Sequence, residues 1–220
     1  MGSFIKNELE PFSYLIYAIV IFLQAKKEKS ILRKVHFCFY FFSFIALSYA
    51  SKIAWDETDN NNWIYNIHYI ASSLFFGYYF FNLLISRTLK FLSICLYFFS
   101  GLILILTSYF ITGSFFNSYG SALLFIIVVI TCFLYFKQRF LRYKEEKVLL
   151  TFDLWIVLGY LLYFLGAFLV ILTYSYFTNK LPPEKQYLLA DIWAVQNILL
   201  FIASLLSLIG YLWVSSRKVS

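Results

Sequence analysis

The residues best suited to chemistry lie on one face of a helix that we predict to begin at Trp63. At 100° per residue, six polar and aromatic side chains share that face: Tyr65, His68, Tyr69, Ser72, Phe76 and Tyr79. Polar groups inside a hydrocarbon core are costly, so they mark candidate functional sites. With Asn66 beside it, the stripe predicts one wall of a ligand pocket, and interhelical hydrogen bonding is the alternative.

A second polar face lies on the last predicted helix, where Trp193, Gln196 and Asn197 are spaced i, i+3 and i+4. Two adjacent amides within hydrocarbon need hydrogen-bond partners. We therefore expect a pocket between this helix and the one that begins at Trp63. The predicted ligand-binding residues are Tyr65, Asn66, His68, Tyr69, Ser72, Trp193, Gln196 and Asn197.

Residues that couple such a pocket to a partner are expected mainly on the predicted helix 148–177. The predicted coupling residues are Asp153, Tyr160, Tyr163 and Asp191. The alternative for Asp153 is a carboxylate that reaches the neighbouring lysines or caps a helix. Gly159 and Gly166 lie near each other on another face, which suits close helix packing, either inside the bundle or between two copies of a homo-oligomer.

A metal or cofactor site is not expected. The chain has two histidines, His36 and His68, which we expect on the order of 20–25 Å apart at 1.5 Å per residue, too far to share one metal or haem. The helix 187–214 has no lysine for a retinal Schiff base. We predict no catalytic cluster; His68 with Asp191 is the one acid–base pair available to an intramembrane enzyme. The three cysteines imply no disulfide framework.

The composition indicates a membrane protein. Hydrophobic residues make up 62% of the chain and charged residues 13%, against roughly a quarter charged in soluble domains. Long unbroken apolar runs favour helices over a barrel. We predict one all-α domain, residues 1–220, a polytopic transmembrane helix bundle; if its short first run does not span, the count is six. Seven runs are long enough to span a bilayer: 9–25, 35–54, 63–86, 91–113, 115–136, 148–177 and 187–214.

The charge distribution predicts the orientation. Of the 18 Lys and Arg residues, 14 fall in the segments that share the C-terminal side. Because cytoplasmic loops are enriched in Lys and Arg, we expect the N-terminus outside and the C-terminus in the cytoplasm. This asymmetry accounts for the net charge of +7 without nucleic acid as a partner. It also allows the basic loops to contact anionic lipid headgroups.

One stretch resembles a known family. The segment Asp153-Leu-Trp155-Ile-Val-Leu-Gly159-Tyr-Leu-Leu-Tyr163 is similar to the aromatic-Gly-Tyr pattern of small seven-helix bacterial membrane proteins. Such proteins stand alone or form the membrane input modules of sensor kinases. The outer loop leading to Trp63 is also similar in style. The resemblance implies a sensing role in the bacterial inner membrane, with the output passed to a separate signalling partner, because only a few residues follow the last predicted span.

We therefore expect a non-enzymatic, receptor-like or accessory membrane protein. It would bind an amphipathic ligand or a partner membrane protein through the outer half of its bundle. The alternatives are a transporter of small solutes or lipids and an intramembrane lipid-modifying enzyme. All three prolines lie at or beyond predicted helix ends, so the kinked helices typical of many transporters are not indicated.

Overall fold

The computed structural model describes residues 5, 8–56, 61–112, 116–142, 151–180, 182 and 187–217. Its regular structure there is entirely helical, which confirms the all-α prediction. Seven α-helices and one short π-helical turn, η1, are described: α2 (Leu9–Glu28), α3 (Ile31–Asp56), α4 (Asn62–Leu83), α5 (Arg87–Thr107), η1 (Ser108–Thr112), α6 (Ser118–Arg142), α8 (Phe152–Lys180) and α9 (Tyr187–Arg217).

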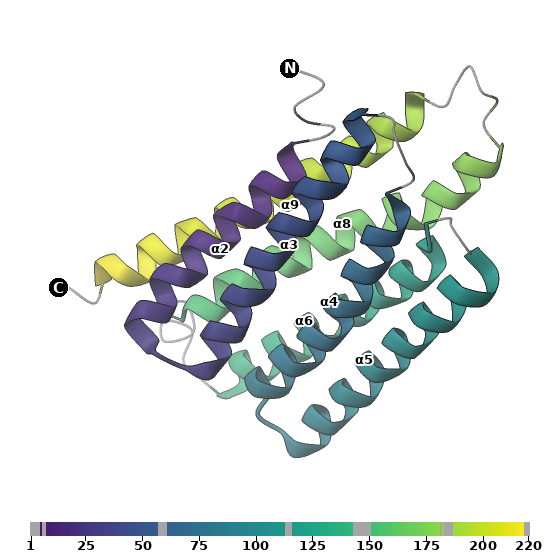
Figure 1. Cartoon of the computed structure of the whole chain (residues 1–220). Helices are drawn as coiled ribbons and strands as arrows, with labels where there is room; N and C mark the ends of the chain where they lie inside the picture. Colours follow the sequence, from purple (N-terminus) through teal and green to yellow (C-terminus); the bar gives the residue numbers. More distant parts are fainter. Residues whose placement is uncertain are drawn as a thin grey trace.

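Helices that are neighbours in the chain run antiparallel and form one bundle (Figure 1). α2 packs against α3 and α9, α8 packs against α6 and α9, and α4 packs against α3, α5 and α6. The bundle has two chemically different ends. We call the end where α2, α4, α6 and α9 finish the basic end, since Lys26, Lys27, Arg139 and Arg217 lie there. We call the end where α2 begins the Glu10 end.

Six of the described helices are long and apolar enough to cross a membrane, and α4 is the one outside this set. The first helix, which the sequence made the weakest span, qualifies with a mean hydropathy of 1.2. α4 is less apolar because it carries the polar stripe predicted from the sequence. The stripe faces inward, as His68, Ser72 and Tyr79 are buried. Burial inside the bundle thus removes the cost of exposing these groups to lipid.

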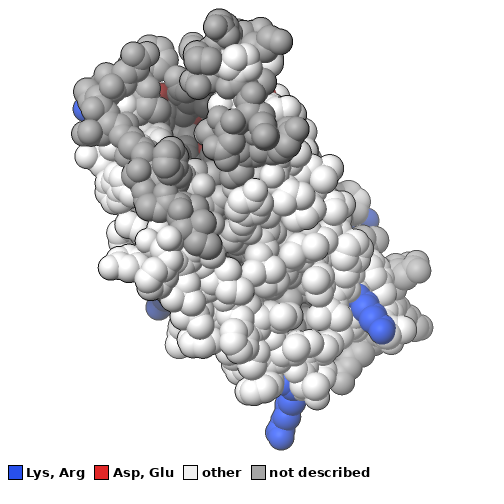
Figure 2. Space-filling view, turned by 90° about the vertical axis from the view of Figure 1, so that its right-hand side faces the viewer, with Lys and Arg blue, Asp and Glu red and all other residues white. Residues whose placement is uncertain are grey.

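The outer surface of the bundle is apolar. Figure 2 shows a face whose broad middle is uncharged, with Lys and Arg projecting near its lower edge. Such a surface far exceeds the apolar patches of soluble monomers, which supports a membrane location. Large apolar side chains are exposed along the helices, among them Ile19, Phe42, Leu74, Phe98, Phe133 and Leu169.

The glycine face of α8 packs inside the bundle. A Cβ added at Gly159 would lie 2.9 Å from the backbone oxygen of Ala203 in α9, and one at Gly166 would lie 2.6 Å from Leu199 Cδ1. Both glycines therefore permit close approach of α8 and α9. The sequence predicted that this face packs either inside the bundle or between two copies of the chain, and in the structure it packs inside the bundle.

The register between α3 and α4 corrects one expectation. The Asn61 side-chain amide donates to the Ala50 backbone oxygen at 3.1 Å, so α4 begins level with Ala50 and α3 extends past it. The rings of His36 and His68 are linked through Phe75 and Phe39. The ring centroids are 5.1 Å apart for His36 and Phe75, 4.0 Å for Phe75 and Phe39, and 5.9 Å for Phe39 and His68. The predicted separation, on the order of 20–25 Å, is therefore wrong, because it assumed that the two helices begin and end at the same depth.

Helix boundaries differ from the predicted ones where side chains cap the ends. α6 begins at Ser118 rather than 115, and Asn117 Oδ1 accepts the Gly120 backbone N–H at 3.0 Å, the interaction typical of a helix N-cap. α3 begins at Ile31, four residues before the predicted 35. The predicted start of the sixth span at 148 lies outside the described residues.

Candidate functional site

A buried carboxylate closes the Glu10 end of the predicted pocket. Glu10 is only 4% exposed, and its Oε2 accepts a hydrogen bond from the Tyr65 hydroxyl at 3.1 Å. Trp193 is a second side-chain hydrogen-bond partner of this carboxylate, and its ring packs edge-on against Tyr65 at 5.4 Å. α2 therefore enters between α4 and α9 and joins the two polar faces that the sequence predicted to line one pocket.

The amide of Gln196 ties three helices together below this closure. Its Nε2 donates to the Tyr163 hydroxyl of α8 at 3.1 Å and to the Tyr69 hydroxyl of α4 at 3.4 Å. Gln196 is fully buried, and its Oε1 has no hydrogen-bond partner among the described residues. Asn197 Nδ2 donates to the Ile5 backbone oxygen at 3.1 Å. The partners that two adjacent amides require are thus tyrosine hydroxyls and backbone.

His68 sits between two spaces in the bundle. Its Nε2 lies 3.1 Å from Ser43 Oγ of α3, and its ring meets that of Tyr14 edge-on at 5.4 Å. Ser72 donates to the His68 backbone oxygen at 2.7 Å, so this hydroxyl is satisfied within its own helix. Asn66 turns instead toward α6, where its Oδ1 accepts the Asn117 backbone N–H at 3.0 Å.

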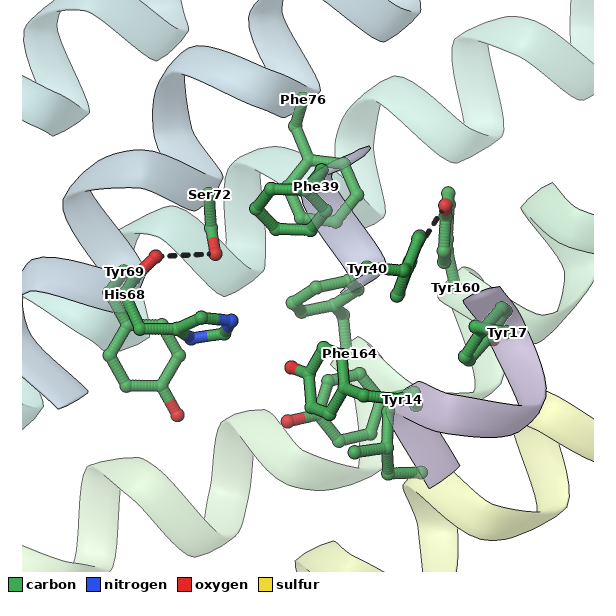
Figure 3. Close-up of a pocket in the computed structure, with 12 residues that line it drawn as sticks. Tyr14, Tyr17, Phe39, Tyr40, His68, Tyr69, Ser72, Phe76, Tyr160 and Phe164 are labelled. Carbon is green, nitrogen blue, oxygen red and sulfur yellow. Dashed lines mark hydrogen bonds between the residues drawn. The ribbon is translucent and has the colours of Figure 1, made fainter. Parts of the chain in front are cut away.

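A small internal cavity lies at the centre of the bundle (Figure 3). The imidazole of His68 points into it, and the hydroxyl pair of Tyr40 and Tyr160 lies on the other side. The space open to the centre of a water molecule is about 20 Å³, enough for one or two waters and too small for an amphipathic ligand. Its lining is rich in tyrosine: Tyr14, Tyr17, Tyr40, Tyr69, Tyr160 and Tyr163.

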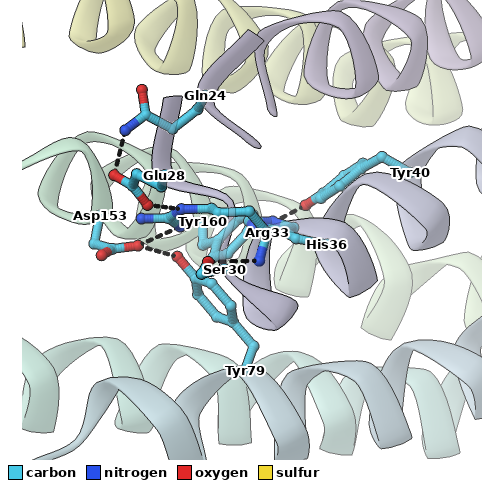
Figure 4. A network of polar contacts seen from close by, with 9 residues as sticks. All are labelled: Gln24, Glu28, Ser30, Arg33, His36, Tyr40, Tyr79, Asp153 and Tyr160. Carbon is cyan, nitrogen blue, oxygen red and sulfur yellow. Dashed lines mark hydrogen bonds and ion pairs between the residues drawn. The ribbon is translucent and has the colours of Figure 1, made fainter. Parts of the chain in front are cut away.

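A second polar network lies at the basic end and centres on Arg33 (Figure 4). Arg33 is 3% exposed, and it contacts Asp153 Oδ1 and Glu28 Oε2 at 2.7 Å each. Gln24 donates to the other Glu28 oxygen, and the Tyr79 hydroxyl donates to Asp153 at 3.2 Å. We call these five residues the Arg33 cluster; they link α2, α3, α4 and α8.

A chain of hydroxyls connects the cavity to His36. Tyr40 donates to the Tyr160 hydroxyl at 2.8 Å, and that hydroxyl lies 2.6 Å from His36 Nε2. His36 is fully buried, and its ring packs against Tyr79 at 4.7 Å. The chain therefore reaches the edge of the Arg33 cluster.

An open groove lies on the far side of α4, between α3 and α4. The space in it open to the centre of a water molecule is about 410 Å³, within the roughly 300–1,000 Å³ of small-molecule sites. His68 and Ser43 are the polar residues of a lining that is otherwise apolar or aromatic, including Phe42, Tyr49 and Trp63. His68 therefore borders both the groove and the central cavity.

The predicted site residues do not all meet in one place. Asp153 and Tyr160 lie toward the basic end, whereas Tyr163 joins Gln196. Asp191 is exposed near the start of α9, while the described contacts of His68 go to α2, α3 and α4. Within the described residues, no three His, Cys, Asp or Glu side chains are grouped as a metal ion would require.

Sequence reasoning missed Glu10, Arg33 and His36 as members of buried networks. None of the three is among the predicted site residues, because the prediction considered polar stripes within single helices and not ion pairs or hydrogen bonds between helices. A usable signal existed for Glu10, since Tyr14 and Tyr17 follow it on the same face of one helix. No family model, curated protein or solved structure matches the chain.

Proposed function

We propose that the chain crosses the bacterial inner membrane seven times, with the Glu10 end outside and the basic end in the cytoplasm. The lysines and arginines that gather at one end favour this orientation. α4 would be the seventh span. Its 22 residues give a length of about 33 Å at 1.5 Å per residue, comparable with the roughly 30 Å of the hydrocarbon core.

We further propose that the protein is a non-enzymatic receptor for an amphipathic ligand, and that the groove between α3 and α4 is its binding site. The groove carries the proposal because it is open and offers about 410 Å³ to the centre of a water molecule, against about 20 Å³ in the central cavity. The predicted pocket between α4 and α9, in contrast, is closed by the contacts of Glu10 with Tyr65 and Trp193. The proposed binding site is therefore on α4, as the sequence predicted, but on the face of α4 that meets α3 rather than the one toward α9.

The lining indicates the chemistry of the ligand. An apolar groove on a lipid-facing surface suits an acyl chain from the outer leaflet. Tyr49 and Trp63 line the groove toward the Glu10 end, and such aromatic residues are typical of membrane interfaces. Lys52 is exposed one turn beyond Tyr49 on α3. An ammonium at this place would favour an anionic headgroup, so a fatty acid is the simplest ligand of this class.

The output would pass through the basic end. Arg33 and Asp153 tie the start of α3 to the start of α8, next to loops that carry most of the positive charge. A movement of α3 on ligand binding in the α3–α4 groove would be transmitted to the basic end, because α3 runs from the groove to Arg33. A separate signalling partner or anionic lipid would contact the basic loops there.

Quenching of tryptophan fluorescence by 9,10-dibromostearate tests the binding site, because bromine quenches an indole that it touches and Trp63 lines the groove. The purified full chain is titrated at a fixed detergent concentration. Ala71→Phe fills the groove from α4, and Ala190→Phe adds the same bulk at an exposed position of α9. We expect saturable quenching in wild type and Ala190→Phe, and an affinity weaker by about tenfold, or 1.4 kcal/mol, in Ala71→Phe.

The headgroup is tested separately with Lys52→Gln. This change should weaken binding of dibromostearate a few-fold, as expected for an exposed ion pair of up to about 1 kcal/mol, and leave binding of its methyl ester unchanged. Equal quenching in Ala71→Phe and Ala190→Phe, or quenching that never saturates, would show that the groove is not a binding site.

A further inference from the structure

Acidic groups lie at both ends of α2. Glu10 and Glu28 are about 27 Å apart along the helix axis at 1.5 Å per residue, close to the roughly 30 Å thickness of the hydrocarbon core. Glu10 is buried with its tyrosine and tryptophan partners. Glu28 pairs with the buried Arg33. Acidic groups thus sit at the two boundaries of the proposed membrane.

Hydroxyl groups fill the space between these ends. Tyr14 lies one turn after Glu10 on α2 and lines the central cavity. On the other side of the cavity, Tyr40 donates to Tyr160, which lies 2.6 Å from His36 Nε2. A hydroxyl donates and accepts hydrogen bonds at once, so it can take up one proton while releasing another. One or two waters would be enough to join Tyr14 to Tyr40 across this cavity.

We propose that this chain of buried groups is a proton-transfer path through the bundle, from Glu10 at the outer end to Asp153 at the basic end. It is a function distinct from ligand binding in the α3–α4 groove. Ionisable and hydroxyl groups that follow one another through a membrane protein are the usual material of proton relays.

Each transfer conserves protons. A proton from a cavity water passes to the Tyr40 oxygen as the Tyr40 proton moves to Tyr160, and the Tyr160 proton moves to His36 Nε2. His36 Nδ1 has no hydrogen-bond partner among the described residues, so the path requires a water molecule that accepts the Nδ1 proton and passes it to Asp153. The His36 ring packs against Tyr79, whose hydroxyl donates to Asp153. Asp153 retains 20% side-chain exposure, which gives the proton an exit.

The arrangement of these hydrogen bonds in a row supports a proton relay more than a purely structural role. Tyr40, Tyr160 and His36 come from α3 and α8 and form one unbranched row of hydrogen bonds. Charged groups beside its inner end are Arg33, Glu28 and Asp153, two acids and one base.

Proton flux into liposomes tests the path. The full chain is reconstituted into phosphatidylcholine vesicles that contain potassium and pyranine, and valinomycin sets a potential that draws protons inward. We expect internal acidification faster than in protein-free vesicles. Tyr160→Phe removes one hydroxyl from the row and keeps the ring, and it should slow the flux by about tenfold, equivalent to about 1.4 kcal/mol on the barrier. Tyr40→Phe should act in the same way.

Tyr119→Phe is the matched control, because Tyr119 is 64% exposed at the start of α6. Vesicles with this variant should conduct protons like those with wild type. Circular dichroism and size-exclusion profiles of the vesicle extracts establish that each variant is folded. Wild-type flux equal to that of protein-free vesicles at either polarity would overturn the proposal. So would a folded Tyr160→Phe or Tyr40→Phe variant that conducts like Tyr119→Phe, because the row would then serve packing alone.

Discussion

Replacing Arg33 by methionine should be among the most destabilising single changes in the chain. Arg33 is 3% exposed and holds Asp153 and Glu28 at 2.7 Å each. Breaking a buried ion pair by removing one partner costs about 3–5 kcal/mol, because the other charge stays buried without compensation. Asp153 keeps the Tyr79 hydroxyl and 20% side-chain exposure, so the lower part of this range applies.

The contribution of Glu28 is smaller. Its side chain is 33% exposed, and ion pairs in contact with solvent contribute about 0–1 kcal/mol. Arg33→Met should therefore lower the free energy of unfolding by about 3 kcal/mol, nearly all of it through Asp153. Adding Asp153→Leu to Arg33→Met should recover most of the loss, since replacing both partners by apolar groups is often close to neutral.

Equilibrium unfolding by SDS in mixed micelles, followed by circular dichroism, measures these changes. Lys34→Met is the control, because Lys34 is the next residue of the same helix and is exposed. The reasoning is refuted if Arg33→Met and Lys34→Met unfold at the same SDS fraction. It is also refuted if the double variant is less stable than Arg33→Met alone, since the lost stability would then not come from an uncompensated Asp153.

Three further predictions follow from contacts in the bundle. Gly159→Ala should lower the thermal unfolding temperature in detergent well below that of Gly166→Ala, because the new methyl meets backbone in the first case and a movable leucine end in the second. Gln196→Leu should cost about 1 kcal/mol in SDS unfolding, as its two tyrosine acceptors lose their donor; an unchanged midpoint would contradict these bonds. In cells, a charged thiol reagent should label Lys52→Cys from outside and Arg87→Cys only after permeabilisation, and labelling of both from outside would show that α4 does not span.

The helices could be predicted because their signal is local. The predicted apolar runs contain 17 to 30 residues, and a helix covers most of each run. The predicted boundaries were less accurate than the helices themselves, and the start of α3 is an example. α3 begins four residues early, where the Ser30 hydroxyl accepts the Arg33 backbone N–H at 3.2 Å, and its Arg33 side chain is paired with Asp153, 120 positions away in the chain. Ser30 is a local capping signal, whereas no spacing within 31–35 indicates the ion pair with Asp153.

The candidate site was predictable in part for the same reason. The polar stripe on α4 and the amides on α9 are periodic, so the faces that carry them were identified from sequence. What fills the space between them was not, because it is Glu10 from a third helix, placed by its bonds to Tyr65 and Trp193. Periodicity shows that a face is buried, but the partner across it depends on how the helices are arranged.

The least apolar helix, α4, connects the two proposed activities. One side of it meets tyrosines and Gln196 around the central cavity, and the other side forms the groove with α3. His68 borders both spaces, and Ser43 holds its Nε2 at 3.1 Å. A ligand that drew Ser43 away would release an imidazole nitrogen beside the hydroxyls of the path. The two activities are separable, because filling the groove with Ala71→Phe leaves the hydroxyl row intact, whereas Tyr160→Phe breaks the row and leaves the groove open.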